Sequence, residues 1–249
     1  MPEADQPGKK LVGQWAVCAI AAAAARFVPV PLLDDAVRLR ATQVAVVATL
    51  RANQRDYPSA AVEPLYAGAD AGLGGTFQDA RRYLKSVPRR VLLFPVRKYV
   101  AVFGAVKGVP TDVMQVLVLA RTVHRCLGQG RLAGSDPKEL RPAAAQIRTA
   151  FDRTISGLDL RLLTGALADA LSQGKGLTVA AVGYARKAFS QDGADPALGP
   201  ALDPSGELGR GAERVEEVLQ RPEISRLLAE FDARFDLQLS ERQASPRRG

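Results

Sequence analysis

The residues of this chain that could support acid–base, nucleophilic or metal chemistry are few. There is one histidine, His124, and there are two cysteines, Cys18 and Cys126, which lie far apart in the sequence. A structural zinc site takes four Cys or His ligands, so these three residues are too few to form one. We therefore expect a packing role for His124, no metal or cofactor, and reduced cysteines in a cytoplasmic protein.

Carboxylates that could act as a catalytic pair are equally scarce. Asp34 and Asp35 are the adjacent acids that stand among apolar residues, just after Pro31. Carboxylates in the first turn of a helix are stabilised by its dipole, and this is the role we expect for them. Asp34 also precedes Arg38 by four residues, a favourable spacing for an ion pair. The glycine-rich stretches lack the spacing of phosphate-binding loops, so we expect a protein that is not an enzyme.

The positive charge of the chain collects in one stretch. The net charge is +8, and the segment from Ala80 to Thr111 holds eight basic residues and no acidic one, so the rest of the chain sums to zero. The basic residues are Arg81, Arg82, Lys85, Arg89, Arg90, Arg97, Lys98 and Lys107. An uncompensated cationic segment indicates an anionic partner.

Apolar residues separate these charges and narrow the choice of partner. The runs VLLF at 91–94 and YVAVF at 99–103 supply more apolar surface than a face that follows nucleic-acid phosphates normally carries. Basic residues beside apolar ones suit a helix at a membrane interface, so we hypothesise that segment 81–107 attaches reversibly to anionic lipid at the inner membrane face. In the alternatives, the apolar runs belong to the core and the charges only solvate its edge, or the segment binds an acidic protein or, less favourably, nucleic acid.

The composition predicts that helices position these residues. The chain contains 41 Ala and 26 Arg, both strong helix formers. A first helix is expected over 11–28, and its unbroken apolar run at 15–25 covers about 16 Å, too short to cross a hydrocarbon layer of roughly 30 Å. Residues 9–25 could instead act as a signal sequence. A second helix is expected to end near residue 53, and residues 57–75 are expected to be loose.

The remaining pattern predicts an all-α protein, a multi-helix bundle built from packed helical hairpins with a C-terminal helical arm. The helical domain spans 10–190, and residues 1–9 and 240–249 are expected to be disordered. Within it, further helices are expected over 76–87, 95–107, 111–127, 136–155, 160–171 and 177–189. Residues 191–211 are rich in Pro and Gly and predict a linker.

Residues 212–239 predict two amphipathic helices separated at Pro222. One of them carries a narrow apolar stripe, made of Ile224, Leu227, Leu228, Phe231 and Phe235. The stripe could dock on the protein's own core or bind a protein partner. The second possibility makes the chain a soluble scaffold or adaptor, which is the alternative to membrane attachment.

Two segments share one arrangement. In AAAARFVPVPLLDDAVRLRATQVAVV and in AVFGAVKGVPTDVMQVLVLARTVHRCL, an apolar helix ends in one basic residue, followed by Val-Pro, an aspartate and a second apolar helix. We expect the two hairpins to pack together as the core of the bundle.

The first of these segments resembles a known family. Residues 15–55, with Pro29, Pro31, Asp34 and Gln43, are similar to the hydrophobic helical domain of unknown function that accompanies some bacterial GTPases. The resemblance implies a bacterial, membrane-associated protein. The chain departs from that family by lacking a GTPase motif and by having Leu32-Leu33 where the family has a glycine.

Overall fold

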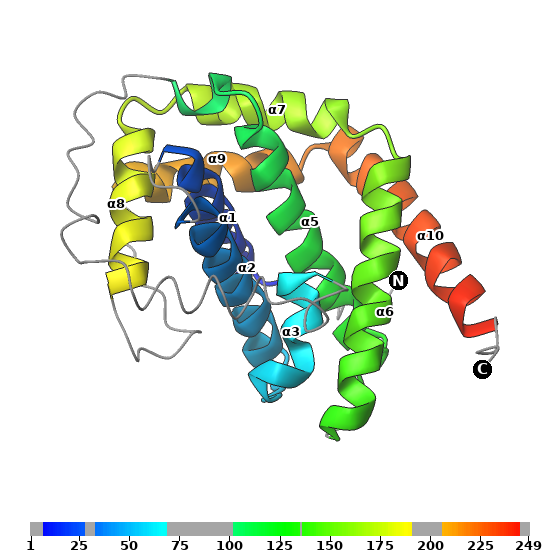
Figure 1. Cartoon of the computed structure of the whole chain (residues 1–249). Coiled ribbons are helices and arrows are strands. Elements are labelled where there is room, and N and C mark those ends of the chain that lie inside the picture. Colours follow the sequence, from blue (N-terminus) through cyan, green and yellow to red (C-terminus); the bar gives the residue numbers. More distant parts are fainter. Residues whose placement is uncertain (1–6, 28–32, 69–101, 135, 191–205, 245–249) are drawn as a thin grey trace.

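The computed structural model describes residues 7–27, 33–68, 102–134, 136–190 and 206–244, and in these ranges every regular element is a helix. The described chain forms an all-α, multi-helix bundle, as its composition and periodicity predict (Figure 1). No helix among the described residues is long and apolar enough to span a membrane.

The alanine-rich helix α1 (Lys9–Ala24) forms the centre of the bundle. Every side chain from Trp15 to Ala24 is buried. Small side chains let neighbouring helices approach closely, and α1 contacts α2 (Leu33–Ala52), α5 (Val109–Gly128), α8 (Leu177–Ser190) and α9 (Glu207–Leu219). The packing explains a helix that is apolar almost all round, since it has neighbours on every side.

Helices α1 and α2 form the first predicted hairpin, and α1 ends in a short 3₁₀ turn, η2 (Ala25–Phe27). The second predicted hairpin differs. Its first helix was expected over 95–107, but the described part contains only the 3₁₀ turn η5 (Phe103–Ala105), with Val102 and Val106 in extended backbone on either side. Residues 69–101, which include the expected helix over 76–87, lie outside the described residues.

A helix stands where the sequence predicted loose structure. The short helix α3 (Ser59–Ala67) contains Pro64, and it buries Val62, Leu65 and Tyr66 against α6 (Pro137–Gly157). Arg141 and Arg148 of α6 also donate to backbone carbonyls of α3. A short segment that contains proline does not favour a helix by itself, so packing against α6 is what stabilises α3.

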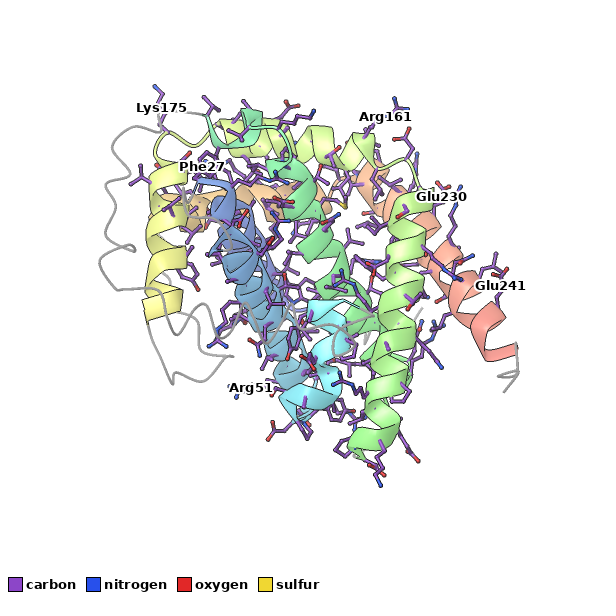
Figure 2. The ribbon with its side chains drawn as sticks, viewed as in Figure 1. Phe27, Arg51, Arg161, Lys175, Glu230 and Glu241 are labelled. Carbon is purple, nitrogen blue, oxygen red and sulfur yellow. The ribbon has the colours of Figure 1, made fainter. Side chains whose placement is uncertain are left out.

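The second half of the chain closes the bundle. Helix α7 (Arg161–Ser172) lies across one end, in contact with α5 and α9, as Figure 1 shows. In Figure 2 the side chains of Arg161, Lys175, Glu230 and Glu241 extend outward from the helices, whereas Phe27 lies among them. Phe27 stacks on the buried Phe103 with ring centroids 5.4 Å apart, which fastens η5 to the end of α1.

The C-terminal boundaries need correction. Helix α9 begins at Glu207, inside the predicted linker 191–211, and residues 191–205 lie outside the described residues. Helix α10 (Pro222–Ala244) continues into the predicted tail 240–249. Both helices contribute side chains to the same hydrophobic cluster as α1 and α5, so the predicted C-terminal arm is docked on the helical domain.

Candidate functional site

Of the eight basic residues predicted to contact an anionic partner, only one lies within the described residues. Lys107 is exposed, and it directly precedes Gly108, which caps α5. Arg81, Arg82, Lys85, Arg89, Arg90, Arg97 and Lys98 lie outside the described residues. Of the apolar run at 99–103, Val102 is 49% exposed but Phe103 is buried, so that run is not surface throughout.

The turns of the two similar segments meet in space at the end of the basic segment. Besides the Phe27–Phe103 stack, Arg26, which lies in the turn after α1, pairs with Asp112 in the first helical turn of α5. Arg26 donates to Asp112 from Nε and from Nη2, the second hydrogen bond being 3.0 Å long. The basic residue of the first segment therefore pairs with the aspartate of the second.

The Asp112 carboxylate is buried and compensated. It is 4% exposed, which makes it one of the few charged side chains in the core. The hydrogen bonds that Arg26 donates to Asp112 raise the pKa of the Arg26 guanidinium above its ordinary value, and the charge of Asp34 acts in the same direction although burial opposes it. A carboxylate this deeply buried needs such a partner, because burial of an unpaired charge is costly.

Gly108 makes room for the Arg26 guanidinium. Its φ is +91°, and a Cβ built on it would lie 2.5 Å from Arg26 Cζ. Glycine is the residue that takes this backbone conformation at low cost and leaves the space empty. The glycine after Lys107 thus has a packing reason that its sequence context did not reveal.

Arg38 also turns toward Asp112. The expected pair with Asp34 does not form among the described residues; instead Arg38 Nη2 lies 3.7 Å from an Asp112 oxygen, beyond hydrogen-bond distance. Its Nε is buried and has no hydrogen-bond partner among the described residues, whereas the side chain as a whole is 36% exposed. Arg26, Arg38, Asp112 and Lys107 together are called the Asp112 cluster below.

The apolar stripe of α10 is occupied by the protein itself. Ile224, Leu228, Phe231 and Phe235 are buried and Leu227 is partly buried, with Phe231 packed edge-on against Phe151 of α6. Of the two roles open to the stripe, docking on the core is therefore the one the structure shows. The expectation that it is available to a protein partner is corrected, because its side chains are covered.

Ion pairs hold α10 in place beside the stripe. Arg121 of α5 donates two hydrogen bonds of 2.7 Å to Asp232, and Arg125, one turn later, pairs with Asp236. Arg131 reaches the same Asp236 at 2.7 Å. A bidentate pair fixes the relative orientation of the two side chains in addition to neutralising their charges. These pairs therefore set the register of α10 against α5.

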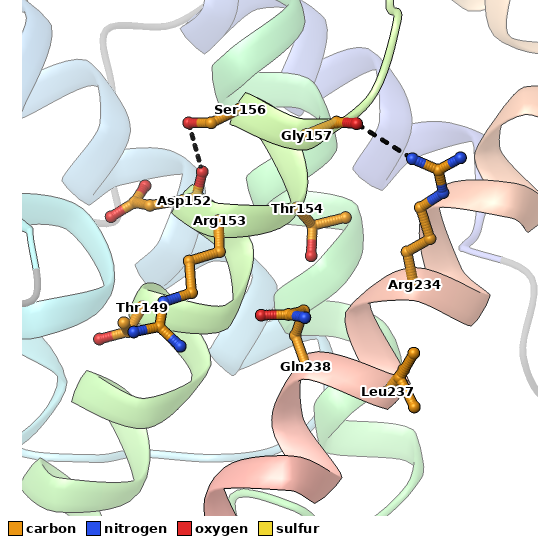
Figure 3. Close-up of a pocket in the computed structure, with 9 residues that line it drawn as sticks. All are labelled: Thr149, Asp152, Arg153, Thr154, Ser156, Gly157, Arg234, Leu237 and Gln238. Carbon is orange, nitrogen blue, oxygen red and sulfur yellow. Dashed lines mark hydrogen bonds between the residues drawn. The ribbon is translucent and has the colours of Figure 1, made fainter.

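A shallow groove lies between the C-terminal end of α6 and α10, with a volume of about 910 Å³ (Figure 3). The hydroxyls of Thr149, Thr154 and Ser156 donate to carbonyls one turn earlier in α6, so they can offer a ligand only lone pairs. Arg234 donates hydrogen bonds to the Gly157 carbonyl and to Glu230. The groove thus combines hydrogen-bond acceptors with the guanidinium of Arg153, which pairs with no acid in the described part of the chain, and this combination matches no single class of ligand.

His124 and the cysteines have packing roles in the structure. His124 is half-buried, edge-on to Trp15 with ring centroids 5.9 Å apart, and its Nδ1 lies 2.9 Å from Asn53 Nδ2, which confirms the expectation. Burial raises the pKa of both Cys18 and Cys126 to about 12, so neither thiol is a ready nucleophile. Among the described residues, no group of three His, Cys, Asp or Glu side chains could hold a metal ion.

The fold and these contacts define an all-α helical bundle with a charged cluster where two similar turns meet. Comparisons with protein-family models, with curated proteins and with solved structures find no match to this chain.

Proposed function

We propose that this protein has a non-enzymatic role and attaches reversibly to an anionic membrane surface through segment 81–107. The observation that carries the proposal is the charge distribution: the segment 80–111 has eight basic residues and no acidic one, and its charge equals the net charge of the whole chain. Clustered Lys and Arg beside apolar residues are the usual requirement for binding anionic headgroups.

The way the described helices use their own arginines supports the proposal. Many arginines of the described bundle pair with acidic side chains, among them Arg26, Arg121, Arg125, Arg131, Arg141 and Arg148. Segment 81–107 has no acid of its own to pair with. Its basic residues must therefore find their anionic partner outside the segment, whereas arginines in helices that also carry carboxylates can pair within the helix.

The bundle holds the chain in α3, before this segment, and again at Phe103, near its end. On one side, Tyr66 of α3 is buried and its hydroxyl donates to the Ser59 carbonyl. On the other side, Phe103 is buried against Phe27, while Val102 and Lys107 are exposed. A segment with anchored chain on both sides loses less entropy on binding than a free tail would.

The expected attachment is weak and sensitive to salt. Each Lys or Arg near an anionic leaflet contributes about 1 kcal/mol, and the effect falls off within a Debye length. Three to six engaged residues would therefore give roughly 3–6 kcal/mol at low ionic strength. Binding of this size is reversible and is lost as salt is added.

Co-sedimentation with vesicles tests the proposal. We expect the protein to pellet with phosphatidylcholine vesicles that contain phosphatidylglycerol, not with phosphatidylcholine alone, and to be released as salt rises. Replacing Arg81, Arg82, Arg89 and Arg90 by Gln should weaken binding by up to roughly a thousandfold. The matched control replaces Arg55, Lys175, Arg221 and Arg226, which are exposed and form no ion pair in the described part of the chain, and should bind as the unaltered protein does.

Two outcomes would contradict the proposal. Failure of the unaltered protein to pellet with anionic vesicles at low salt is one, and equal loss of binding in both quadruple variants is the other. Retention on DNA at moderate salt, together with failure to bind vesicles, would favour a nucleic-acid partner for the same segment.

A further inference from the structure

Arg38 carries hydrogen-bonding capacity that the described chain does not use. A guanidinium has five N–H donors. Arg38 forms no hydrogen bond with any described residue, and its one ion contact, to Asp112, is 3.7 Å long. Its Nε is buried without a partner, a situation that native proteins avoid unless an unseen water or ion is present.

The carboxylate nearest to Arg38 is already engaged. Arg26 uses Nε and Nη2 to hold both oxygens of Asp112, in the geometry that best suits a guanidinium and a carboxylate. Asp34 acts on the charge of Arg26 but makes no ion pair with Arg38. Two guanidiniums thus share one buried carboxylate, and the second is left with its hydrogen-bond donors free.

Both guanidiniums can be reached from solvent. The side chains of Arg26 and Arg38 are each 36% exposed, whereas Asp112 between them is 4% exposed. An arriving anion would therefore meet the cations before the carboxylate. Arg26 keeps Nη1 unused by Asp112, and Lys107, one residue before the glycine that touches Arg26, adds an exposed positive charge to the same turn.

A second arginine with buried, unbonded nitrogens shows what distinguishes Arg38. Arg214 on α9 also has a partnerless Nε, but its Nη2 is buried as well and lies against Gly174. No ligand can reach those donors without displacing the loop before α8. At Arg38 only Nε is enclosed, so the Nη groups remain available.

We propose that Arg38, together with Arg26, binds a phosphate group at the Asp112 cluster. A phosphate has enough oxygens to accept hydrogen bonds from two guanidiniums at once, and paired arginines bind phosphate in this way. Either a lipid headgroup or a small soluble molecule supplies this phosphate, and the experiments distinguish the two sources. Arg26 and Arg38 lie outside segment 81–107, so phosphate binding by these two arginines can be tested separately from membrane attachment by that segment.

Titration with inorganic phosphate, followed by the NMR signals of the arginine Nε–H groups, tests the site. At constant ionic strength, we expect a saturable shift of the Arg38 signal that chloride does not produce. Arg38→Gln should weaken phosphate binding roughly tenfold or more, since a hydrogen bond to a charged group is lost. Arg38→Lys keeps the charge but not the fork and should recover only part of the affinity. Arg55→Gln, which removes an exposed arginine elsewhere, should leave the titration unchanged.

A second measurement identifies the source of the phosphate. Arg38→Gln is compared with the unaltered protein on phosphatidylcholine vesicles with and without phosphatidylglycerol. A loss of anionic-vesicle binding, with phosphate competing, assigns the site to a headgroup, whereas unchanged vesicle binding with a lost phosphate titration assigns it to a soluble ligand. The proposal is overturned if the shift of the Arg38 signal does not saturate with phosphate, or if the folded Arg38→Gln variant keeps the phosphate affinity of the unaltered protein.

Discussion

At the residue scale, the main finding is the sharing of one buried carboxylate by two arginines. Asp112 accepts two hydrogen bonds from Arg26 but interacts with Arg38 only by charge. The local spacing favoured an Asp34–Arg38 pair worth a few tenths of a kcal/mol. A buried carboxylate attracts a guanidinium more strongly than an exposed one, because less solvent screens it.

Gly108→Ala tests the close packing at this cluster. The new Cβ would lie 2.5 Å from Arg26 Cζ, and φ of +91° is strained for alanine. We expect a loss of about 1–3 kcal/mol in the free energy of unfolding, measured by urea denaturation. Gly13→Ala is the control: nothing lies within 4 Å of its Cβ, and in mid-helix it should stabilise by up to about 1 kcal/mol. Equal effects of the two substitutions would contradict this account of Gly108.

At the scale of elements, the C-terminal helix α10 is a structural part of the bundle. Its stripe is buried against α6, and its acids pair with arginines of α5 and of the turn that follows. An amphipathic helix with such a stripe is equally suited to a partner or to its own core. Here the carboxylates Asp232 and Asp236 have matching arginines, which explains why the helix docks on its own chain.

Phe235→Ala measures how much this docking contributes. Phe235 is fully buried, so truncation should cost about 3–5 kcal/mol of unfolding free energy. Leu237, two residues away on the same helix, is 58% exposed, and Leu237→Ala should change stability by no more than about 0.5 kcal/mol. Thermal and urea unfolding of both variants provide the comparison. Similar losses would mean that the stripe is not the docked face.

At the scale of the whole molecule, charge pairing links stability to pH. Burial alone would raise the pKa of the Asp236 carboxyl, but the hydrogen bond from Arg125 and the charges of Arg125 and Arg131 outweigh burial and lower it. A carboxyl whose pKa is lower in the folded state stabilises the fold above its unfolded pKa of about 3.9. That contribution disappears as pH falls through the folded pKa.

Asp236→Asn should therefore destabilise the protein at neutral pH, by about 1 kcal/mol for a partly exposed pair. The difference from the unaltered protein should begin to shrink as pH falls below about 4, where the unfolded state takes up its proton first, and it should vanish once pH is below the lowered pKa of the folded state. Unfolding free energies measured from pH 7 to pH 3 check this. Asp169→Asn, an exposed acid without an ion pair in the described part of the chain, should show no such trend. A difference that stays constant with pH would exclude the charge of Asp236 as its cause.

The amino-acid sequence alone was enough to predict the helical class and most helix positions, since these depend on neighbours along the chain. Asp136 caps α6 and accepts a hydrogen bond from the Lys138 amide, and Pro222 separates α9 from α10, both as their local chemistry predicts. Helix α3 was missed because its stability comes from packing on α6. The basic segment was recognised by charge, which needs no knowledge of the fold.

The pairing of distant side chains could be known only from the folded chain. Arg38 and Asp112, or Arg125 and Asp236, are separated by many residues, and no spacing rule relates them. Their proximity depends on how α1, α2, α5 and α10 pack, which follows from the shapes of buried side chains rather than from periodicity. The same packing covers the stripe of α10 and leaves the guanidinium of Arg38 without a hydrogen bond to any described residue.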